Sequence, residues 1–534
     1  MSRMPNLLTC VLSAAVLTAA GAAHGAPAPQ ALELTVEVDA QGARVLSARP
    51  VASLPDPVRK GVETLQLLGH DGASLGSASL PDPRIRSSIP MPGTEDVAHS
   101  SVSLASGIVV VRVPWTGVAV AEARFRGRDV VVPPLSAMGS QGRSSTSLPR
   151  PPPGDAVLLQ DSGPSSDRLD LVFLGDGYTE DQLGDYARDV DRMTGYLLSI
   201  EPYGAYSDLF NVWRVDVVSN DSGASHFETG RNDAADTALG CYYGCGGIDR
   251  LTCCDDSTVM SLVGDTVPGA DGIMVLINDD TYGGSGGFNY ATSYVGFDFG
   301  TQVAAHELGH SLIGLWDEYG YGGTGSGDGP NCTSDPDGNW DSWKGVNGID
   351  AYPECSWSNL YRPTDDNCMM RTLSDDYCSV CRQEAVREIY RRMPGLVASL
   401  NPPPDPKLVV DAGGTRTGDV TIEVTTHAPE RSLDFEWRLG GDVVGDDPTF
   451  DVSCAGLEGE LTLTVQDPTP WVRDDPEGLL NQDVGPWRIR SGRCEDTVVD
   501  KTAEALGCQA APAPASLGAL LGLLALLRRR AHRS

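Results

Sequence analysis

Apolar and polar residues alternate in short runs along the first and last parts of the chain. Near the N-terminus these runs include "LELTVEVDA", "GIVVVRVPW" and "VAVAEARFRGRDVVV", with turn residues between them. A period of two is typical of strands that bury one face. The pattern predicts an antiparallel β-sandwich over residues 26–137. Similar runs, among them "DVTIEVTTH" and "ELTLTVQD", predict a second β-sandwich over residues 407–500.

The middle of the chain has a different pattern. Apolar runs such as "LDLVFLGD", "LFNVWRVDVVS" and "DGIMVLIND" indicate strands. Between the first two runs, residues recur at helical spacing, at Leu183, Ala187, Val190, Thr194 and Leu197. Strands that alternate with helices predict an α/β or α+β domain over residues 161–398. The expected fold class is therefore a multidomain protein in which an α+β domain is flanked by two β-sandwiches.

Proline-rich segments separate these domains. Residues 138–160 contain "SSTSLPRPPPGD" and residues 399–406 contain "NPPPDP", and both compositions are typical of linkers. A chain of 534 residues exceeds the size at which one hydrophobic core stops growing, which agrees with several domains. The predicted order is a signal peptide (1–25), the N-terminal sandwich (26–137), a linker (138–160), the α+β domain (161–398), a linker (399–406), the C-terminal sandwich (407–500) and a tail (501–534).

Both ends of the chain carry signals for export. The N-terminus has one Arg, an apolar run and small residues before Ala26, which is the pattern of a secretory signal peptide. The C-terminus combines Cys508, an apolar span of about 515–527 and three arginines, and it resembles the sorting tags of bacterial surface proteins. A short membrane anchor is the alternative, although the span is shorter than the ~20 residues of a spanning helix. We expect a secreted or cell-surface protein.

The charge of the chain limits its partners. There are 39 Lys and Arg against 73 Asp and Glu, which gives a formal net charge of -34. Such a surface repels phosphate backbones and anionic lipids, so nucleic acid is not expected as a partner.

Thirteen cysteines are expected to form mostly disulfides, because an exported chain meets oxidising conditions. Eleven of them fall into the groups Cys241, Cys245, Cys253 and Cys254, then Cys332, Cys355, Cys368, Cys378 and Cys381, then Cys454 and Cys494, while Cys10 and Cys508 lie in the predicted signal peptide and tail. The central region holds an odd number, so one thiol is expected to be free or cross-paired. The spacing Cys378-x-x-Cys381 would suit a zinc ribbon, but no second pair with that spacing is present, which argues against this interpretation.

The stretch "QVAAHELGHSLIGLW" has the pattern of a metal-binding helix. Its apolar residues Ala304, Leu308, Leu312 and Leu315 fall on one side of a helix. His306 and His310 lie on the opposite side, one turn apart, so both imidazoles can reach one zinc ion. Glu307 lies beside them and is the candidate general base, because zinc lowers the pKa of its bound water toward ~7 and a carboxylate can take the proton.

The third metal ligand must come from outside this helix. Gly314 can adopt the left-handed conformation that ends a helix and turns the chain back. Asp317 follows three residues later and is our choice, since a carboxylate oxygen is an acceptable zinc ligand. Glu318 is its neighbour and could substitute for it, and Tyr319 either orients substrate or packs. His226 is the remaining candidate.

These residues form the pattern HExxHxxxGxxD, which resembles the motif of the metzincin metallopeptidases with one extra residue before the glycine. Together with "GDGYT" at 175–179, "FNVWRVDVVSNDSGASH" at 210–226 and "CMMRTLSDDYCSVC" at 368–381, they resemble the secreted bacterial zinc peptidases named for their IgA-cleaving member. The resemblance implies a zinc endopeptidase with Asp317 as third ligand and a Met-turn. Met369 or Met370 is the candidate for that turn. The IgA substrate is not implied.

Two other patterns suggest different sites. "GGSGG" at 283–287 fits a serine-hydrolase motif, but a strand rather than a helix is expected after it, so we favour a glycine-rich strand that borders the substrate cleft. "DPDGNWD" at 335–341 has oxygen ligands at a spacing like that of calcium loops, which makes Ca²⁺ a further candidate cofactor, but the full twelve-residue pattern is missing and a plain acidic loop is favoured. The expected partner is a protein or peptide substrate. A surface adhesion protein on a peptidase scaffold and a zinc amidase remain the alternative functions.

Overall fold

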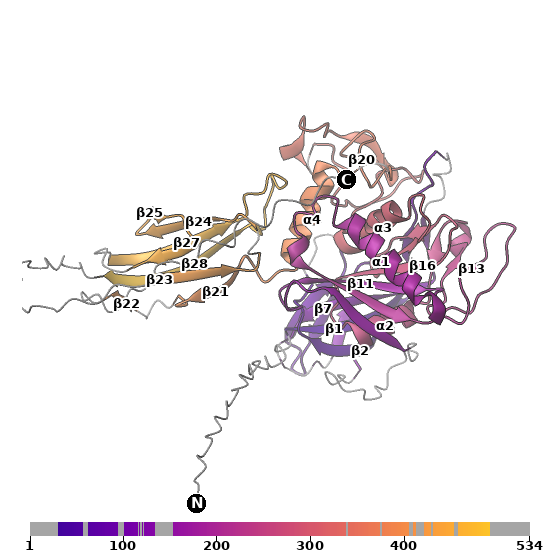
Figure 1. Ribbon diagram of the computed structural model, residues 1–534, viewed down its shortest axis with the longest axis horizontal. Coiled ribbons are helices and arrows are strands. Elements are labelled where there is room, and N and C mark those ends of the chain that lie inside the picture. The colour runs from indigo at the N-terminus through magenta and orange to yellow at the C-terminus, as the bar shows by residue number, and fades with distance from the viewer. Residues whose placement is uncertain are drawn as a thin grey trace, which may run out of the picture.

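The computed structural model describes residues 30–491 except 57–61, 94–100, 116, 118–119, 121, 134–152, 338–339, 374–375, 405–408, 413–420, 429–430 and 453–457. The predicted signal peptide, the C-terminal tail and the proposed Cys454–Cys494 pair lie outside the described residues. Multiple sheets with few helices confirm a multidomain α+β protein (Figure 1).

The N-terminal region is built from strands only. Two sheets, with the strand orders β2-β1-β7 and β4-β3-β8-β9, enclose a common apolar core that includes Leu34, Leu67, Val111 and Phe125. A separate pair, β5-β6, extends from them. The strands are β1 Ala31–Asp39, β2 Gly42–Val51, β3 Thr64–Leu68, β4 Ser74–Ser79, β5 Ile85–Ser87, β6 Ser101–Ser103, β7 Ser106–Pro114, β8 Glu122–Phe125 and β9 Arg128–Val130.

A six-stranded sheet with the order β10-β12-β11-β16-β18-β17 forms the centre of the protein. Its four inner strands are parallel, and both edge strands are antiparallel to their neighbours. The strands are β10 Gly154–Gln160, β11 Leu169–Asp176, β12 Phe210–Val217, β16 Gly272–Ile277, β17 Gly284–Ser285 and β18 Ala291–Tyr294. Smaller sheets flank it, built from β13 Ser225–His226, β14 Tyr242–Tyr243 and β15 Thr252–Cys253, and from β19 Tyr352–Cys355 and β20 Trp357–Arg362.

Helices cover both faces of this sheet. Every residue of the inner strand β11 is therefore buried. Leu171 and Phe173 face α1 and α3, whereas Val172 and Leu174 share a core with α2. The helices are α1 Leu183–Leu197, α2 Asp256–Thr266, α3 Gly300–Leu308 and α4 Ser379–Arg391, with the π-helical turn η4 Gly309–Ile313 and the 3₁₀ turns η1 Glu180–Gln182, η2 Ser207–Leu209, η3 Cys245–Gly247 and η5 Asp341–Trp343.

The C-terminal region again consists of strands, and Figure 1 shows it projecting to one side of the central sheet. Its sheets have the orders β21-β23-β26 and β22-β28-β27-β24-β25. Asp467 joins this region to the centre by accepting hydrogen bonds from Tyr206 and Tyr390, and it accepts a further one from Arg431 of its own region. The strands are β21 Val397–Asn401, β22 Val409–Ala412, β23 Thr421–Thr426, β24 Asp434–Leu439, β25 Asp442–Gly445, β26 Thr449–Asp451, β27 Glu458–Gln466 and β28 Asn481–Ser491.

Strands extend into both predicted linkers. β10 lies in the range 138–160 and pairs with β12, so the central sheet starts before residue 161. β21 runs into the range 399–406 and pairs with β23. At these ends, pairing with a neighbouring strand outweighs the proline-rich composition. Among the described helices, none is both long and apolar enough to cross a membrane.

Candidate metal centre

The helix α3 brings the candidate residues to the middle of the protein. It follows β18, the strand next to the sheet edge, and His306 and Glu307 on it are fully buried. Tyr377 fixes the helix by donating a hydrogen bond to the carbonyl of Ala305 at 2.6 Å. A Cβ at Gly309 would lie 2.9 Å from Met370 Sδ, so the glycine lets the methionine approach the backbone between the two histidines. Both Met369 and Met370 are completely buried, and Met370 is the one under this turn.

The extra residue in the sequence motif is taken up by a change of helix type. After Leu308 the helix continues as the π-helical turn η4, which holds one more residue than an α-helical turn. Gly314 follows with φ 82°, the left-handed conformation expected from the sequence. The chain then turns back, and Asp317 reaches the two histidines. The wider turn thus keeps the step from glycine to aspartate unchanged.

His306, His310 and Asp317 meet at one point, and we call them the histidine centre. Asp317 Oδ1 lies 3.0 Å from His306 Nε2 and 3.2 Å from His310 Nε2, and the two nitrogens are 3.2 Å apart. Ligands bound at about 2.0–2.1 Å in a tetrahedral site are separated by about 3.3 Å. The three atoms therefore have nearly the spacing that a metal ion requires.

The outer ring nitrogens fix the protonation of both imidazoles. His306 Nδ1 donates to the carbonyl of Met369 at 2.9 Å, and His310 Nδ1 donates to the carbonyl of Leu315 at 2.7 Å. A carbonyl oxygen only accepts, so each Nδ1 carries a hydrogen, and in its neutral form each ring presents the lone pair of Nε2 to the centre. Two lone pairs and a carboxylate that face one another repel, and a cation between them would remove the repulsion. This donor set fits a divalent metal ion.

Charge and burial shift the pKa values of this centre. Burial opposes ionisation of Asp317, but the neighbouring His310 and His306 hold its pKa well below the usual range. Conversely, Asp317 outweighs the effect of burial on His310 and raises its pKa to about 9. The other oxygen of Asp317 accepts a hydrogen bond from the Tyr321 hydroxyl, so the carboxylate is held from both sides.

Glu307 lies beside the histidine centre without being part of it. Its Oε2 is 3.9 Å from His310 Nε2 and has no hydrogen-bond partner among the described residues. Its Oε1 accepts a hydrogen bond of 3.4 Å from the backbone N–H of Ile89. Burial raises the pKa of Glu307 to about 7, since desolvation disfavours the charged form. A carboxyl group with this pKa and a free oxygen can exchange a proton near neutral pH.

The N-terminal region reaches into this site. Ser87 pairs in antiparallel fashion with Gly286, next to the edge strand β17, through hydrogen bonds of 3.2 Å and 3.0 Å. Arg86, only 1% exposed, anchors the segment by donating to Asp256 at 2.9 Å and to the carbonyl of Tyr290 at 3.0 Å. A strand is therefore present at "GGSGG", and part of its outer edge is occupied by this protein's own chain.

A cavity of about 150 Å³ remains next to the centre. Its lining includes His310 and Asp317, the aromatic residues Trp316, Tyr321 and Trp357, and residues of the N-terminal region. This is smaller than the 300–1,000 Å³ typical of ligand pockets. It offers room for one side chain next to the metal position rather than for a whole peptide.

Several other candidates lie elsewhere. His226 hydrogen-bonds Glu228 at 2.8 Å and Asp279 at 2.9 Å and stacks on Tyr243, so it does not enter the histidine centre. Ser285 in "GGSGG" donates to the carbonyl of Thr252 at 2.6 Å inside the sheet, which does not fit an exposed nucleophile.

The suggested calcium loop falls partly outside the described residues. Of its acids, Asp337 and Asp341 form ion pairs with Lys344. Calcium there stays a prediction.

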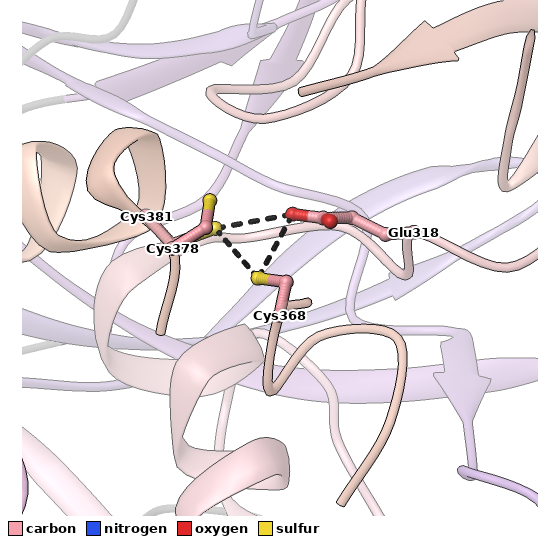
Figure 2. Close-up of side chains that lie close together, drawn as sticks. All are labelled: Glu318, Cys368, Cys378 and Cys381. Atoms are coloured by element: carbon pink, nitrogen blue, oxygen red, sulfur yellow. Dashed lines mark hydrogen bonds between the residues drawn. The ribbon is translucent and has the colours of Figure 1, made fainter. Parts of the chain in front are cut away.

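Disulfides are present as expected, and they pair Cys241 with Cys254, Cys245 with Cys253 and Cys332 with Cys355. A second group of side chains was missed by the sequence analysis. It consists of Glu318, Cys368, Cys378 and Cys381, and we call it the cysteine cluster (Figure 2). The search for a second Cys-x-x-Cys pair could not find it, because two of its members lie outside such a pair. The signals in the sequence were the odd number of cysteines in the central region and the Cys378-x-x-Cys381 spacing, which was judged on the zinc-ribbon pattern alone.

One comparison with known proteins identifies the central region. Residues 157–339 match the family model described as IgA Peptidase M64. No curated protein gives a significant match to the chain. The matched range includes α3 and the whole histidine centre, and it ends before the three thiols of the cysteine cluster. The match agrees with the resemblance found in the sequence, and over residues 157–339 it supports a metallopeptidase of the IgA-peptidase family.

Proposed function

We propose that this protein is a zinc-dependent endopeptidase in which His306, His310 and Asp317 hold the metal and Glu307 is the general base. The observation that carries the proposal is the convergence of two imidazole lone pairs and one carboxylate oxygen beside a buried glutamate with a free oxygen. Nitrogen and oxygen donors in this number suit zinc with one position left for water or substrate. The left-handed turn after the histidine helix further supports a metzincin-like fold. The apolar core that the two N-terminal sheets share supports an N-terminal β-sandwich.

Zinc at this site would make a water molecule acidic enough to attack a peptide carbonyl at neutral pH. Glu307 would accept the proton from that water through its free Oε2 and then deliver it to the leaving amine. Met369 and Leu315 hold the imidazole rings in the required tautomer through their carbonyl groups. An extended substrate would add as a strand along the edge at β17, which runs past Glu307 and His310.

The test of this function is the substitution Glu307→Gln in the full chain. It removes the base and no metal ligand, so zinc content should stay at the wild-type value while cleavage of a denatured-proteome peptide library falls at least about 100-fold. Glu423→Gln, at an exposed position of β23, is the matched control and should keep full activity. A Glu307→Gln variant that keeps more than a few per cent of the wild-type rate would exclude this glutamate as the base.

The same assay separates the alternative functions. A surface adhesion protein would cleave no peptide with or without a chelator. A zinc amidase would leave the peptide library intact and release amines from glycan or cell-wall amides in a chelator-sensitive manner.

Export to the medium or the cell surface is the remaining part of the proposal. The support comes from the signal-like N-terminus and the tail with Cys508, an apolar run and arginines. Intact-mass measurement on native protein should find the first 25 residues removed and the tail either trimmed or retained in the surface fraction. A freely soluble chain that still ends at Ser534 would contradict this.

A further inference from the structure

The cysteine cluster has the composition and burial of a metal site. Glu318, Cys368 and Cys381 are fully buried, and Cys378 is 6% exposed. One ligand atom from each residue can be chosen so that all of them lie within 4.8 Å of one another. Figure 2 shows the three thiols and the carboxylate converging from three different segments of the chain.

The distances in the cluster suit a tetrahedral ion. The sulfurs of Cys368 and Cys381 are 3.6 Å apart, and Glu318 Oε1 lies 3.2 Å from each of them. With metal–sulfur bonds of about 2.3 Å and metal–oxygen bonds of about 2.0–2.2 Å, a tetrahedral zinc site has sulfur–sulfur edges of about 3.8 Å and sulfur–oxygen edges of about 3.5 Å. A disulfide would require its sulfurs about 2.0 Å apart.

Two hydrogen bonds hold the Glu318 carboxylate in an orientation in which it faces the thiols. Asn331 donates to Glu318 Oε1 at 3.1 Å, and Thr364 donates to Oε2 at 3.2 Å. Three sulfurs and one oxygen around a closed, buried point leave no position for water, which is typical of structural rather than catalytic zinc. The oxygen ligand also favours zinc over Cu(I), which prefers sulfur alone.

The cluster is adjacent in sequence to the parts that orient the histidine centre. Glu318 follows Asp317, and its N–H donates to the carbonyl of Met370 at 2.9 Å. Cys368 precedes Met369, whose carbonyl holds His306. An ion in the cluster would therefore join the loop that carries the third catalytic ligand to the turn that fixes the first.

We propose that the cysteine cluster binds a second, structural zinc ion that ties the Met369–Met370 turn to the loop of Asp317. The site is separate from the proposed catalytic ion and does not depend on the protein being a peptidase. Its function is to position Asp317 and Met369, whose carbonyl binds His306. Among the described residues, no disulfide links the loop of Asp317 to the turn of Met369.

Metal content tests the proposal on the full chain. Elemental analysis should give two zinc ions per wild-type chain and one in His306→Ala/His310→Ala, which leaves the cluster intact. X-ray absorption of that variant should show mainly sulfur neighbours at about 2.3 Å. Nitrogen and oxygen neighbours alone, or no bound zinc, would overturn the proposal. If the wild-type chain holds a single ion with sulfur neighbours, the cluster proposal stands and the catalytic ion is refuted.

Thiol mapping tests the competing possibility of a disulfide without any variant. The full chain is denatured with a chelator and without reductant, alkylated, and digested for mass spectrometry. All of Cys368, Cys378 and Cys381 should be alkylated, while Cys332 and Cys355 should stay linked as the internal control. A disulfide between any two cysteines of the cluster would overturn the proposal.

The rate at which each ion is released to a chelator tests whether the cysteine cluster positions Asp317. Glu318→Gln keeps the shape of the side chain and weakens the metal bond, so the sulfur-bound ion should be lost to a chelator faster than in the wild type. The catalytic ion should then also leave more readily, because the loop of Asp317 is less restrained. Unchanged release rates for both ions would contradict the coupling.

Discussion

At the scale of single residues, two neighbouring acids are directed to different sites. Asp317 joins the two histidines, whereas Glu318 joins three thiols, and both are completely buried. The Tyr321 hydroxyl holds the outer oxygen of Asp317. For Glu318 to reach the histidines and Asp317 to reach the thiols, the backbone of the loop would have to adopt a different conformation. Sequence alone left Glu318 as a substitute ligand for the histidine centre, and its distance from that centre follows only from the folded loop.

This arrangement predicts that Asp317→Ala loses most of the nitrogen-bound zinc. Only two imidazoles would remain, and they make a weak site on their own. His226→Ala is the matched control, since His226 is also buried and hydrogen-bonded to acids but lies outside the centre. It should keep its zinc. Elemental analysis with X-ray absorption would measure this, and an Asp317→Ala protein with unchanged nitrogen and oxygen neighbours would show that another residue is the third ligand.

At the scale of elements, the π-helical turn η4 and Gly314 set the path from His310 to Asp317. A residue with a side chain at φ 82° costs about 1–2 kcal/mol, because its Cβ approaches the neighbouring backbone. Gly345 has a similar φ of 76° in a loop distant in sequence, with nothing within 4 Å of the position that a Cβ would take. The two glycines therefore form a matched pair.

We expect Gly314→Ala and Gly345→Ala to lower thermal stability by similar amounts. Only Gly314→Ala should also weaken zinc binding, since it shifts the chain between two ligands. Chelator competition would measure the affinity. Equal zinc affinity in both variants would mean that the turn does not determine the position of Asp317.

The sequence was sufficient for elements whose signals are local. The histidine helix and its glycine stop were predicted from spacing and backbone preference, and both are present. Helix α1 was predicted as well, but its buried face is formed by Tyr186, Val190, Met193 and Leu197. Tyr186 buries its ring and donates its hydroxyl to the carbonyl of Phe173 at 2.8 Å, a contact that periodicity of apolar residues does not reveal.

Contacts between distant segments could not be predicted. The cysteine cluster needs Glu318 and a cysteine 50 residues later to meet, and no local pattern encodes that pairing. The strand β10 was missed because its proline-rich flank resembles a linker, whereas its pairing with β12 decides its structure. The same holds for the segment around Arg86, whose partners are 170 and 204 residues away.

At the scale of the whole molecule, the N-terminal region and the central sheet share the site. Ser87 occupies the edge at Gly286, and Ile89 donates its N–H to Glu307 and accepts a hydrogen bond from Tyr282 at 3.1 Å. A substrate strand that adds to this edge needs the same hydrogen-bonding groups. The segment must therefore move aside before an extended peptide can reach Glu307.

Loosening the segment should then increase activity. Arg86→Ala removes the buried anchor to Asp256 and Tyr290, and we expect kcat/KM for a long peptide to rise several-fold, mainly through a lower KM. Arg84→Ala is the matched control, because within the described part of the chain the Arg84 side chain hydrogen-bonds Asp82 of its own region, so its removal should change little. Circular dichroism would verify that both variants fold. A loss of activity in folded Arg86→Ala would show that the segment builds the site instead of blocking it.

The pairing of Ser87 with Gly286 also determines how activity depends on protein concentration. An occupant that belongs to the same chain is present at a fixed effective concentration near its edge, however dilute the protein is. Activity per molecule should therefore stay constant over a dilution series, in contrast to a separate inhibitor, which dissociates on dilution. A free peptide that copies residues 85–91 would have to compete with this tethered copy, so it should inhibit Arg86→Ala at lower concentrations than the wild type.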